Sequence, residues 1–523
     1  MTNNSYFYMT IEVLHPLVHS LTKSEKRYCR LMAGRQGGDK PDAARPNAAR
    51  PDAARSFVRL FDCLLRHETP GEALTADLAR QFPGATLEAA RKYLYRVLMQ
   101  SLRQYEGAKR LEVRIGQLLH DSQILYERGL VQFSQDQLEK ARMLAEQQER
   151  GLYVVLAARQ QVDQWVRWQF DGVDEPTLAN QHALIRTQLE GTQTALHHAA
   201  LYETLLLRYR TQGMMTSAAD KLRLNDLLLE EYQLLNRQNR VGPHGRPGLM
   251  RSFAMQQQHL HFQSAYFRMI GDGEGSLRVY RELDALFQQN PTLWAEQPLY
   301  YVQLLEGILS DLRLLEQYAD MPFFIDRLRL FDTPLQGLNH VVPYVVLYHS
   351  LLSLVDQRGY TDAADLLKTF LPQGPAFERG LAHLALPART EFELLLIRLS
   401  VGQGQLSVGL RRLNRVLARP ARSLPRPLYT QIRLMHLLLL ARLGNADSLT
   451  YALRSVERKL SATGGGSEGE QLVIALLRHW LAGKSSAELL IHLDTFNGSP
   501  ADHQLLRNLD VRPWAEAMTD GSQ

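Results

Sequence analysis

Residues 301–315, YVQLLEGILSDLRLL, place apolar side chains at positions 301, 304, 305, 308, 309, 312 and 315. This spacing of three and four residues puts all of them on one face of an α-helix. The stretch after Arg110 repeats the pattern, and residues 432–443 are apolar almost all round, as expected of a helix packed between neighbours. We find no sustained alternation of apolar and polar residues, and we interpret Pro343, in the one β-rich stretch, as the first turn of a helix. The chain is therefore predicted to be all-α.

Glycine-containing turns recur between the predicted helices. Their separations are 43, 41, 58, 88, 45 and 40 residues, at Gly129, Gly172, Gly213, Gly271, Gly359, Gly404 and Gly444. We expect a glycine-free turn near Tyr318 within the longest separation, and a turn-rich insert at residues 236–248 within the separation of 58. A period of about 40–45 residues is typical of stacked helical hairpins, because one hairpin cannot bury both of its faces. The pattern predicts an α-solenoid, built as a right-handed stack of hairpins.

Several hairpins resemble the tetratricopeptide repeat (TPR). In the first, Leu125, Gly129 and Ala141 occupy the places where that family has its large, glycine and small residues. In a later one, GYTDAADLL at residues 359–367 supplies the glycine and two alanines that allow two helices to pack closely. The resemblance implies a TPR-like solenoid.

A second resemblance spans most of the chain. LTKSEKRYCRLMAG at residues 21–34 and ARKYLYRVLMQSLRQY at residues 90–105 look like the opening of an uncharacterised bacterial family of helical-repeat proteins. Members of that family also carry a C-terminal unit similar to LARLGNADSLTYALRSVERKL at residues 440–460. The resemblance implies the helical-repeat architecture and brings no assigned activity.

We predict two regions. Residues 1–108 form a small N-terminal helical cap region, and residues 109–523 form the α-solenoid of hairpin repeats. Within the first region, residues 34–55 contain the low-complexity run PDAARPNAARPDAAR. Three prolines at five-residue intervals prevent a continuous helix, so we expect a solvated, disordered insert there.

Composition favours a folded protein of the cytoplasm. The chain has 523 residues, more than one compact core of roughly 250–300 residues, and 45% of them are hydrophobic. Lys and Arg number 60 against 55 Asp and Glu, a net charge of +5 that permits an acidic partner without requiring one. Residues 1–21 lack the features of a signal peptide, and no apolar run approaches the ~20 residues of a membrane helix. We therefore expect a cytoplasmic protein with no membrane partner.

The two cysteines are Cys29 and Cys63. A structural zinc site needs more thiols, or histidines at ligand spacing, and we find neither. We therefore expect two isolated, buried thiols in a reducing compartment, and no bound metal.

No pattern of an active site or a cofactor site is found. GDGEGS at residues 271–276 lacks the lysine and the preceding strand of a phosphate-binding loop. The histidines at 197, 198, 259 and 261 lack the i,i+4 spacing of helical zinc ligands, and the glutamates at 230 and 231 are expected on a solvated face. Trp165 and Trp168 are predicted to pack in the core, with a ligand-binding platform as the alternative. We expect a protein that is not an enzyme and has no cofactor.

One basic helix face suggests that the protein binds nucleic acid. A short helix in residues 73–82, a turn at Pro83–Gly84 and a longer helix from residue 86 to 105 resemble a helix-turn-helix. The basic and polar residues on the outer face of the second helix are Lys92, Arg96, Gln100 and Arg103. The alternative is an ordinary amphipathic hairpin that caps the solenoid.

Two further basic clusters are candidate surfaces for binding a partner. The alternative is that they are ordinary solvent-exposed faces. They comprise Arg237, Arg240 and Arg246 in the insert, and Arg411, Arg415 and Arg419 before a proline-rich turn. The function that these observations favour is a non-enzymatic scaffold or adaptor whose concave surface binds a protein or peptide. The alternative is a nucleic-acid-linked regulator, in which the N-terminal hairpin contacts DNA and the solenoid senses a partner.

Overall fold

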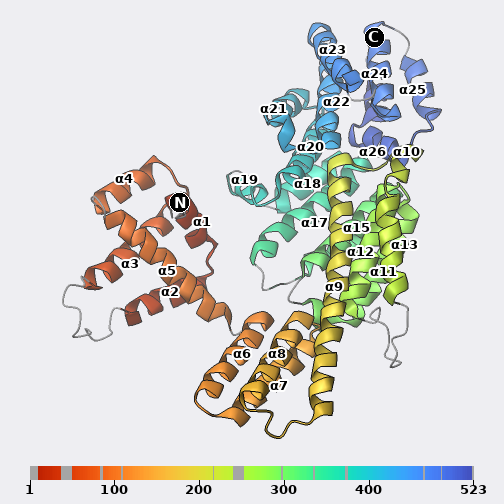
Figure 1. Cartoon of the computed structure of the whole chain (residues 1–523). Helices are drawn as coiled ribbons and strands as arrows, with labels where there is room; N and C mark the ends of the chain where they lie inside the picture. The colour runs from red at the N-terminus through yellow and green to blue at the C-terminus, as the bar shows by residue number, and fades with distance from the viewer. Residues whose placement is uncertain are drawn as a thin grey trace. The chain divides into compact units, whose positions relative to one another are not determined.

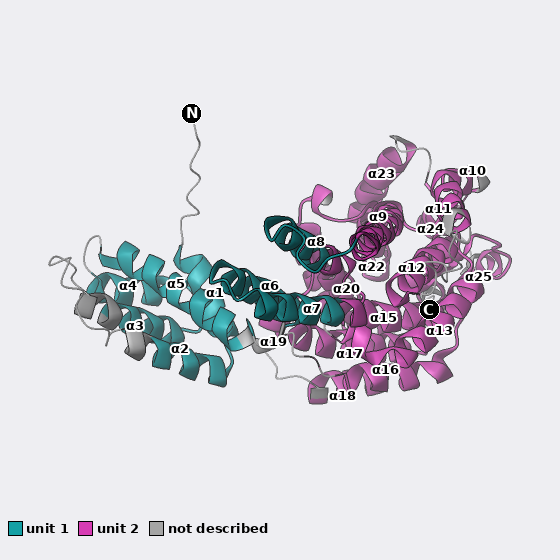
Figure 2. Ribbon diagram, turned by 60° about the horizontal axis from the view of Figure 1, so that its bottom comes forward, with its two compact units in different colours: residues 1–145, 156–174 teal, residues 146–155, 175–523 magenta. Residues whose placement is uncertain are grey.

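The chain folds into helices joined by short turns (Figure 1). The computed structural model describes residues 10–36, 50–82, 86–107, 110–215, 217–238, 252–295, 298–331, 333, 336–370, 375–462, 466–483 and 486–520. No strand occurs in these ranges, so the prediction of an all-α protein is confirmed. The chain divides into two compact units: unit 1 comprises residues 1–145 and 156–174, and unit 2 comprises residues 146–155 and 175–523 (Figure 2).

Unit 1 opens with five helices around one apolar core. They are α1 (Ile11–Ser20), α2 (Lys23–Gln36), α3 (Arg50–Arg66), α4 (Glu72–Gln81) and α5 (Thr86–Gly107). Both α2 and α3 pack on α5, and α1 and α4 pack on α3. Phe57 and Phe61 of α3 and Leu94 and Leu98 of α5 are fully buried, because each pair is spaced four residues apart on the face turned to the core.

The rest of unit 1 uses small and polar side chains at its helix contacts. The helices are α6 (Leu111–Glu127), α7 (Val131–Gln147) and α8 (Gly151–Arg167), whose residues 156–167 belong to unit 1. The hydroxyl oxygens of Ser122 and Ser134 lie 2.9 Å apart, and the Gln164 amide donates to the Ser122 hydroxyl over 3.2 Å. All three side chains are buried, and their mutual hydrogen bonds offset the cost of burying them.

The ends of the predicted insert are helical. Residues 34–36 complete α2 and residues 50–55 begin α3, so they belong to helices rather than to a disordered loop. Residues 37–49 lie outside the described residues, as do residues 108 and 109, where the boundary between the two regions is predicted.

After residues 146–155, unit 2 continues with α9 (Glu175–Gln212), the longest described helix, drawn in yellow in Figure 1. Two helices follow it, α10 (Ala218–Leu222) and α11 (Asn225–Gln238). Five helix pairs come next: α12 (Phe253–Met269) with α13 (Gly273–Gln289), α15 (Leu299–Leu314) with α16 (Met321–Arg329), α17 (Gln336–Asp356) with α18 (Tyr360–Phe370), α20 (Leu386–Gly402) with α21 (Leu406–Leu417), and α22 (Arg426–Arg442) with α23 (Ala446–Ala462). The short helices α14 (Pro291–Trp294) and α19 (Pro375–Leu381) lie between pairs, and α24 (Glu468–Leu481), α25 (Ser486–Asp494), α26 (Pro500–Asn508) and α27 (Val511–Asp520) end the chain.

The first helix of each pair ends in the same way. The turn residues Gly271, Glu316, Arg358, Gly404 and Gly444 all have positive φ, and they recur every 40–46 residues. The next residue's N–H donates to the carbonyl five positions back, as from Gln317 to Leu312 over 2.8 Å and from Asn445 to Leu440 over 3.1 Å. This is the Schellman arrangement, which satisfies carbonyls left free at a helix end. The prediction of a glycine-free turn near Tyr318 is confirmed, with Glu316 in place of glycine.

Consecutive pairs share their cores. Each second helix packs on the next first helix, as α13 does on α15 and α21 on α22. In addition, α15 contacts α17, α17 contacts α20, and α20 contacts α22. Most of residues 432–441 in α22 are buried, as predicted for a helix between neighbours.

Two predictions about local packing are wrong. Pro343 lies inside α17, seven residues after its start, because the flanking residues 342 and 344–347 are buried and their packing outweighs one lost backbone hydrogen bond. Trp168 is 48% exposed, because α8 ends at Arg167 and the chain turns away from the core through Gln169 and Phe170, both at positive φ.

Buried ion pairs join the ends of successive first helices. Arg268 pairs with Asp311 at 2.8 Å and Arg313 with Asp356 at 2.6 Å, each across 43 residues. Asp356 also accepts from Arg398 at 2.9 Å. Burial alone would raise the pKa of Asp356, but the charges of Arg313 and Arg398 outweigh it and lower this pKa. The spacing of these ion pairs is close to the 40–46 residues that separate the positive-φ turns, so first-helix residues at that interval carry opposite charges.

The C-terminal helices pack on the same helix ends. Arg398 also pairs with Asp510 at 2.5 Å, and Arg313 donates to the Asn508 side-chain carbonyl over 2.7 Å. Trp514 of α27 is buried in the core around α22. At the other end of unit 2, α9 contacts both α12 and α22. Helices from the two ends of unit 2 therefore close around its first helices.

By length and composition, α17 passes as a membrane-spanning helix over residues 337–356. Half of its apolar window is buried inside the protein.

Asp356→Ala is expected to lower the free energy of unfolding by about 3–5 kcal/mol, because two buried guanidinium groups would lose their shared carboxylate. Chemical denaturation followed by circular dichroism measures this. The matched control is Asp326→Ala, which breaks an exposed pair with Arg329 and should cost about 0–1 kcal/mol. Equally small effects of both substitutions would show that the buried pairs do not stabilise unit 2.

Candidate functional site

A cavity of about 220 Å³ lies where the first helices of unit 2 converge. Its walls come from α9, α12, α15, α17, α20, α22 and α26. The volume is below the ~300–1,000 Å³ of ordinary small-molecule pockets, so it suits one or two side chains of a peptide better than a cofactor.

The deep wall of the cavity is held in place by the ion pairs described above. Arg313 and Arg398 are both buried, and their guanidinium groups are used by Asp356, Asn508 and Asp510. These two arginines therefore shape the cavity, and they have little capacity left to bind a ligand.

Two charged residues that line the cavity have no such partners. Arg210 is exposed and Glu391 is half-buried, and neither makes a hydrogen bond or ion pair to another described residue. Burial raises the pKa of Glu391, and the positive charges of Arg210 and Arg313 oppose that rise. One cation and one carboxyl group of the lining are thus available to a ligand that carries both charges. Outside the lining residues, burial raises the pKa of Glu306 to about 7, against the opposing charge of Arg210.

His349 is a further unused polar group of the cavity wall. It is 4% exposed, and its Nδ1 has no hydrogen-bond partner among the described residues. Burial, followed by the charges of Arg313 and Arg268, lowers its pKa to about 3, so the ring is neutral at physiological pH. Depending on the tautomer, Nδ1 of a neutral imidazole can donate one hydrogen bond to a bound group or accept one from it.

Ser310 is the serine among the residues that line the cavity, and its hydroxyl donates to the Glu306 backbone carbonyl over 2.7 Å. This bond is made within α15.

The helix-turn-helix candidates lie on α5. Lys92, Arg96 and Arg103 are exposed and Gln100 is half-buried, opposite the buried Leu94, Val97 and Leu98. The Lys92 ammonium pairs with Glu88 at 2.8 Å within the same helix. The basic side chains of this face without an ion pair to a described residue are therefore Arg96 and Arg103. The turn of the predicted helix-turn-helix, at residues 83–85, lies outside the described residues.

Of the two other basic clusters, the first lies mostly outside the described residues and the second lies within them. Arg240 and Arg246 lie outside the described residues, and for Arg237 only the backbone at the end of α11 is described. Arg411 and Arg415 are exposed on α21. Arg419 lies beyond the end of that helix, where it turns to α20 and binds Glu393 at 2.6 Å and the Thr390 hydroxyl at 2.7 Å.

Among the histidines and glutamates singled out in residues 197–261, His197 and Glu230 are exposed. His198 and His261 are buried, and burial lowers the pKa of His261 to about 3. The expectation of a solvated face is wrong for Glu231, which is 5% exposed and pairs with His259 at 2.7 Å. The packing of α12 against the preceding helices brings this pair together, although the two residues are 28 positions apart.

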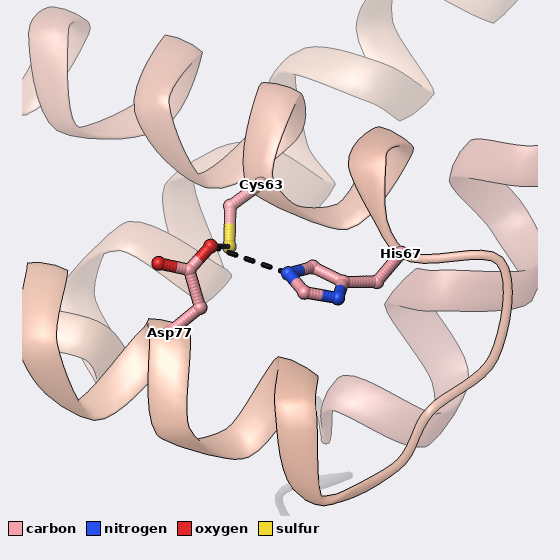
Figure 3. A group of neighbouring side chains, drawn as sticks. All are labelled: Cys63, His67 and Asp77. Carbon is pink, nitrogen blue, oxygen red and sulfur yellow. Dashed lines mark hydrogen bonds and ion pairs between the residues drawn. The ribbon is translucent and has the colours of Figure 1, made fainter.

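In unit 1 a second constellation joins Cys63, His67 and Asp77 (Figure 3). Asp77 Oδ2 accepts from the Cys63 thiol over 3.4 Å and lies 3.2 Å from His67 Nε2. Burial, and then the hydrogen bond and charge of Asp77, raise the pKa of Cys63 to about 11. Hydrogen bonds from Gln81, His67 and Arg80 hold the pKa of Asp77 well below its usual range.

The prediction that both cysteines are buried free thiols is confirmed. The reasoning that no histidine stands at ligand spacing is wrong, because His67 follows Cys63 by four residues. Cys63 lies on the last turn of α3 and His67 just beyond it, so their side chains reach the same side, and α4 brings in Asp77.

Comparison with protein-family models, with curated proteins and with solved structures yields no match.

Glu306→Gln is expected to stabilise the protein by about 1–2 kcal/mol at pH 8 and to be neutral at pH 5. In the folded state the pKa of Glu306 is raised to about 7, so wild-type stability falls as pH rises toward 7 and the uncharged glutamine avoids that loss. Denaturation at the two pH values measures the difference. The control Glu282→Gln, at an exposed position of α13, should change stability equally at both pH values. An effect of Glu306→Gln that does not depend on pH would contradict the raised pKa of Glu306.

Proposed function

We propose that unit 2 is an α-solenoid of helical hairpins, TPR-like with a period of about 40–45 residues, that binds a peptide segment of a partner protein. We call the surface of its first helices around the cavity the inner surface. The observation that carries the proposal is the pair Arg210 and Glu391, two oppositely charged groups on one polar cavity, with no hydrogen bond or ion pair to another described residue. A protein segment with one acidic and one basic side chain matches this pair.

The recurring helix ends support the repeat architecture. Positive-φ turns every 40–46 residues and ion pairs across 42 or 43 residues support a recurrence of equivalent positions along unit 2. In repeat proteins such positions form continuous surfaces, and those surfaces commonly bind extended partners.

The C-terminal helices illustrate the chemistry of the inner surface. Asp510, just after α26, pairs with Arg398. Within α26, the Asn508 side chain accepts from Arg313, and Arg507 donates to the Arg313 backbone carbonyl. A helical segment with polar and charged side chains is therefore already accommodated beside the cavity. A partner segment of similar composition would use the charges that α26 leaves free.

The proposed role is that of a non-enzymatic cytoplasmic adaptor. A nucleic-acid-linked regulator is the second candidate, favoured by Arg96 and Arg103, which lie exposed on α5 without an ion-pair partner among the described residues. The cavity favours the adaptor, because its unpartnered charges are of both signs whereas nucleic acid presents only negative phosphates.

Selection of displayed random peptides on the purified protein tests the adaptor function. The expected consensus pairs an acidic with a basic residue, and Arg210→Glu should weaken the selected peptide at least about tenfold, since it repels the carboxylate. Arg329→Glu, at an exposed position of α16, is the matched control and should leave the affinity unchanged.

The opposite outcome is equally specific. If no peptide is selected and duplex DNA binds tightly, the regulator is favoured. Replacing Lys92, Arg96 and Arg103 by alanine should then flatten the salt dependence of DNA affinity by about two to three units.

A further inference from the structure

We propose that Cys63, His67 and Asp77 form a binding site for a zinc ion in unit 1. The cluster brings a thiol, an imidazole and a carboxylate together from the end of α3 and from α4 (Figure 3). This set matches the ligands that zinc takes in proteins, whereas Mg²⁺ and Ca²⁺ prefer oxygen alone. The site is independent of the peptide surface in unit 2.

The distances fit a tetrahedral ion. Zinc bonds of about 2.0–2.3 Å place neighbouring tetrahedral ligand atoms roughly 3.3–3.8 Å apart. Asp77 Oδ2 lies 3.4 Å from Cys63 Sγ and 3.2 Å from His67 Nε2, and the three ligand atoms all lie within 4.8 Å of one another. Small side-chain rotations suffice to surround an ion, with one position left for water.

The surroundings hold the carboxylate in the orientation that an ion needs. Arg80 and Gln81 each donate to Asp77 Oδ1 over 2.8 Å, which leaves Oδ2 turned to the thiol and the imidazole. His15 Nε2 lies 2.7 Å from the His67 backbone carbonyl and fixes the segment that carries the ring. Contacts of this kind around the ligands are typical of protein metal sites and strengthen binding.

Charge and access are also compatible with the ion. On binding, the Cys63 thiol proton leaves to solvent, so one thiolate and one carboxylate balance the two charges of Zn²⁺. Arg66 approaches Oδ2 at 3.7 Å, but its side chain is 58% exposed and free to move toward water. The Cys63 side chain is buried and His67 is 24% exposed, so the ion reaches the site from the histidine side.

Cobalt titration of the metal-free full-length protein tests the proposal, because Co²⁺ bound to a thiolate shows a sulfur-to-metal charge-transfer band. Wild type should bind one Co²⁺ with this band, and zinc should displace it. Cys29→Ser, which removes the other buried thiol, is the matched control and should behave like wild type. Cys63→Ser should abolish the band, and His67→Ala should weaken zinc binding at least about 100-fold.

The ring of His67 is partly exposed, so His67→Ala tests the site without opening the core, and circular dichroism checks the fold of each variant. The proposal is overturned if wild type shows no charge-transfer band, if the band persists in Cys63→Ser, or if Cys29→Ser alone removes it. The contacts of Asp77 would then serve only to tie α3 to α4.

Discussion

The carboxylate of Asp356 is the constraint on which unit 2 depends. Its side chain is fully buried, and it accepts hydrogen bonds from two equally buried arginines that belong to the hairpins before and after its own. A buried charge without these partners would cost several kcal/mol, so the three helix ends must stay in register. Arg398 extends the same network to Asp510, which fixes the C-terminal helices on the first helices.

This register accounts for the inner surface. Arg313 and Arg398 are committed to structural pairs that hold the cavity wall in place, so the lining charges without an ion-pair partner among the described residues are Arg210 and Glu391. The neutral His349 adds one unused hydrogen-bonding atom at depth. The selectivity that we propose, for a segment with both charges, rests on these unpartnered groups.

The sequence predicted the helices and most turns, because both depend on local features. Apolar periodicity indicates a helix, and a glycine that can adopt positive φ indicates the turn after it. The glycine-free turn at Glu316 was predictable from spacing alone. The ion pairs were not predicted, although their separation of 42 or 43 residues is close to the spacing of the turns, because charge pairing depends on how the helix pairs pack on one another. The cluster in unit 1 was not predicted for a related reason. His67 lies past the end of α3 and Asp77 lies on the next helix, so only packing brings them to Cys63. The exposure of Trp168 could not be predicted, because apolar periodicity does not show where a helix ends.

A double-mutant cycle on Arg398 and Asp510, measured by chemical denaturation, tests most directly whether the buried ion network joins the C-terminal helices to the hairpins. Arg398→Met keeps the apolar stem, and Asp510→Asn removes the charge at a residue with φ of 50°, a conformation that asparagine tolerates. The account predicts a coupling free energy of at least about 1 kcal/mol between these residues, which lie 112 positions apart. Additive effects, within about 0.5 kcal/mol, would contradict it.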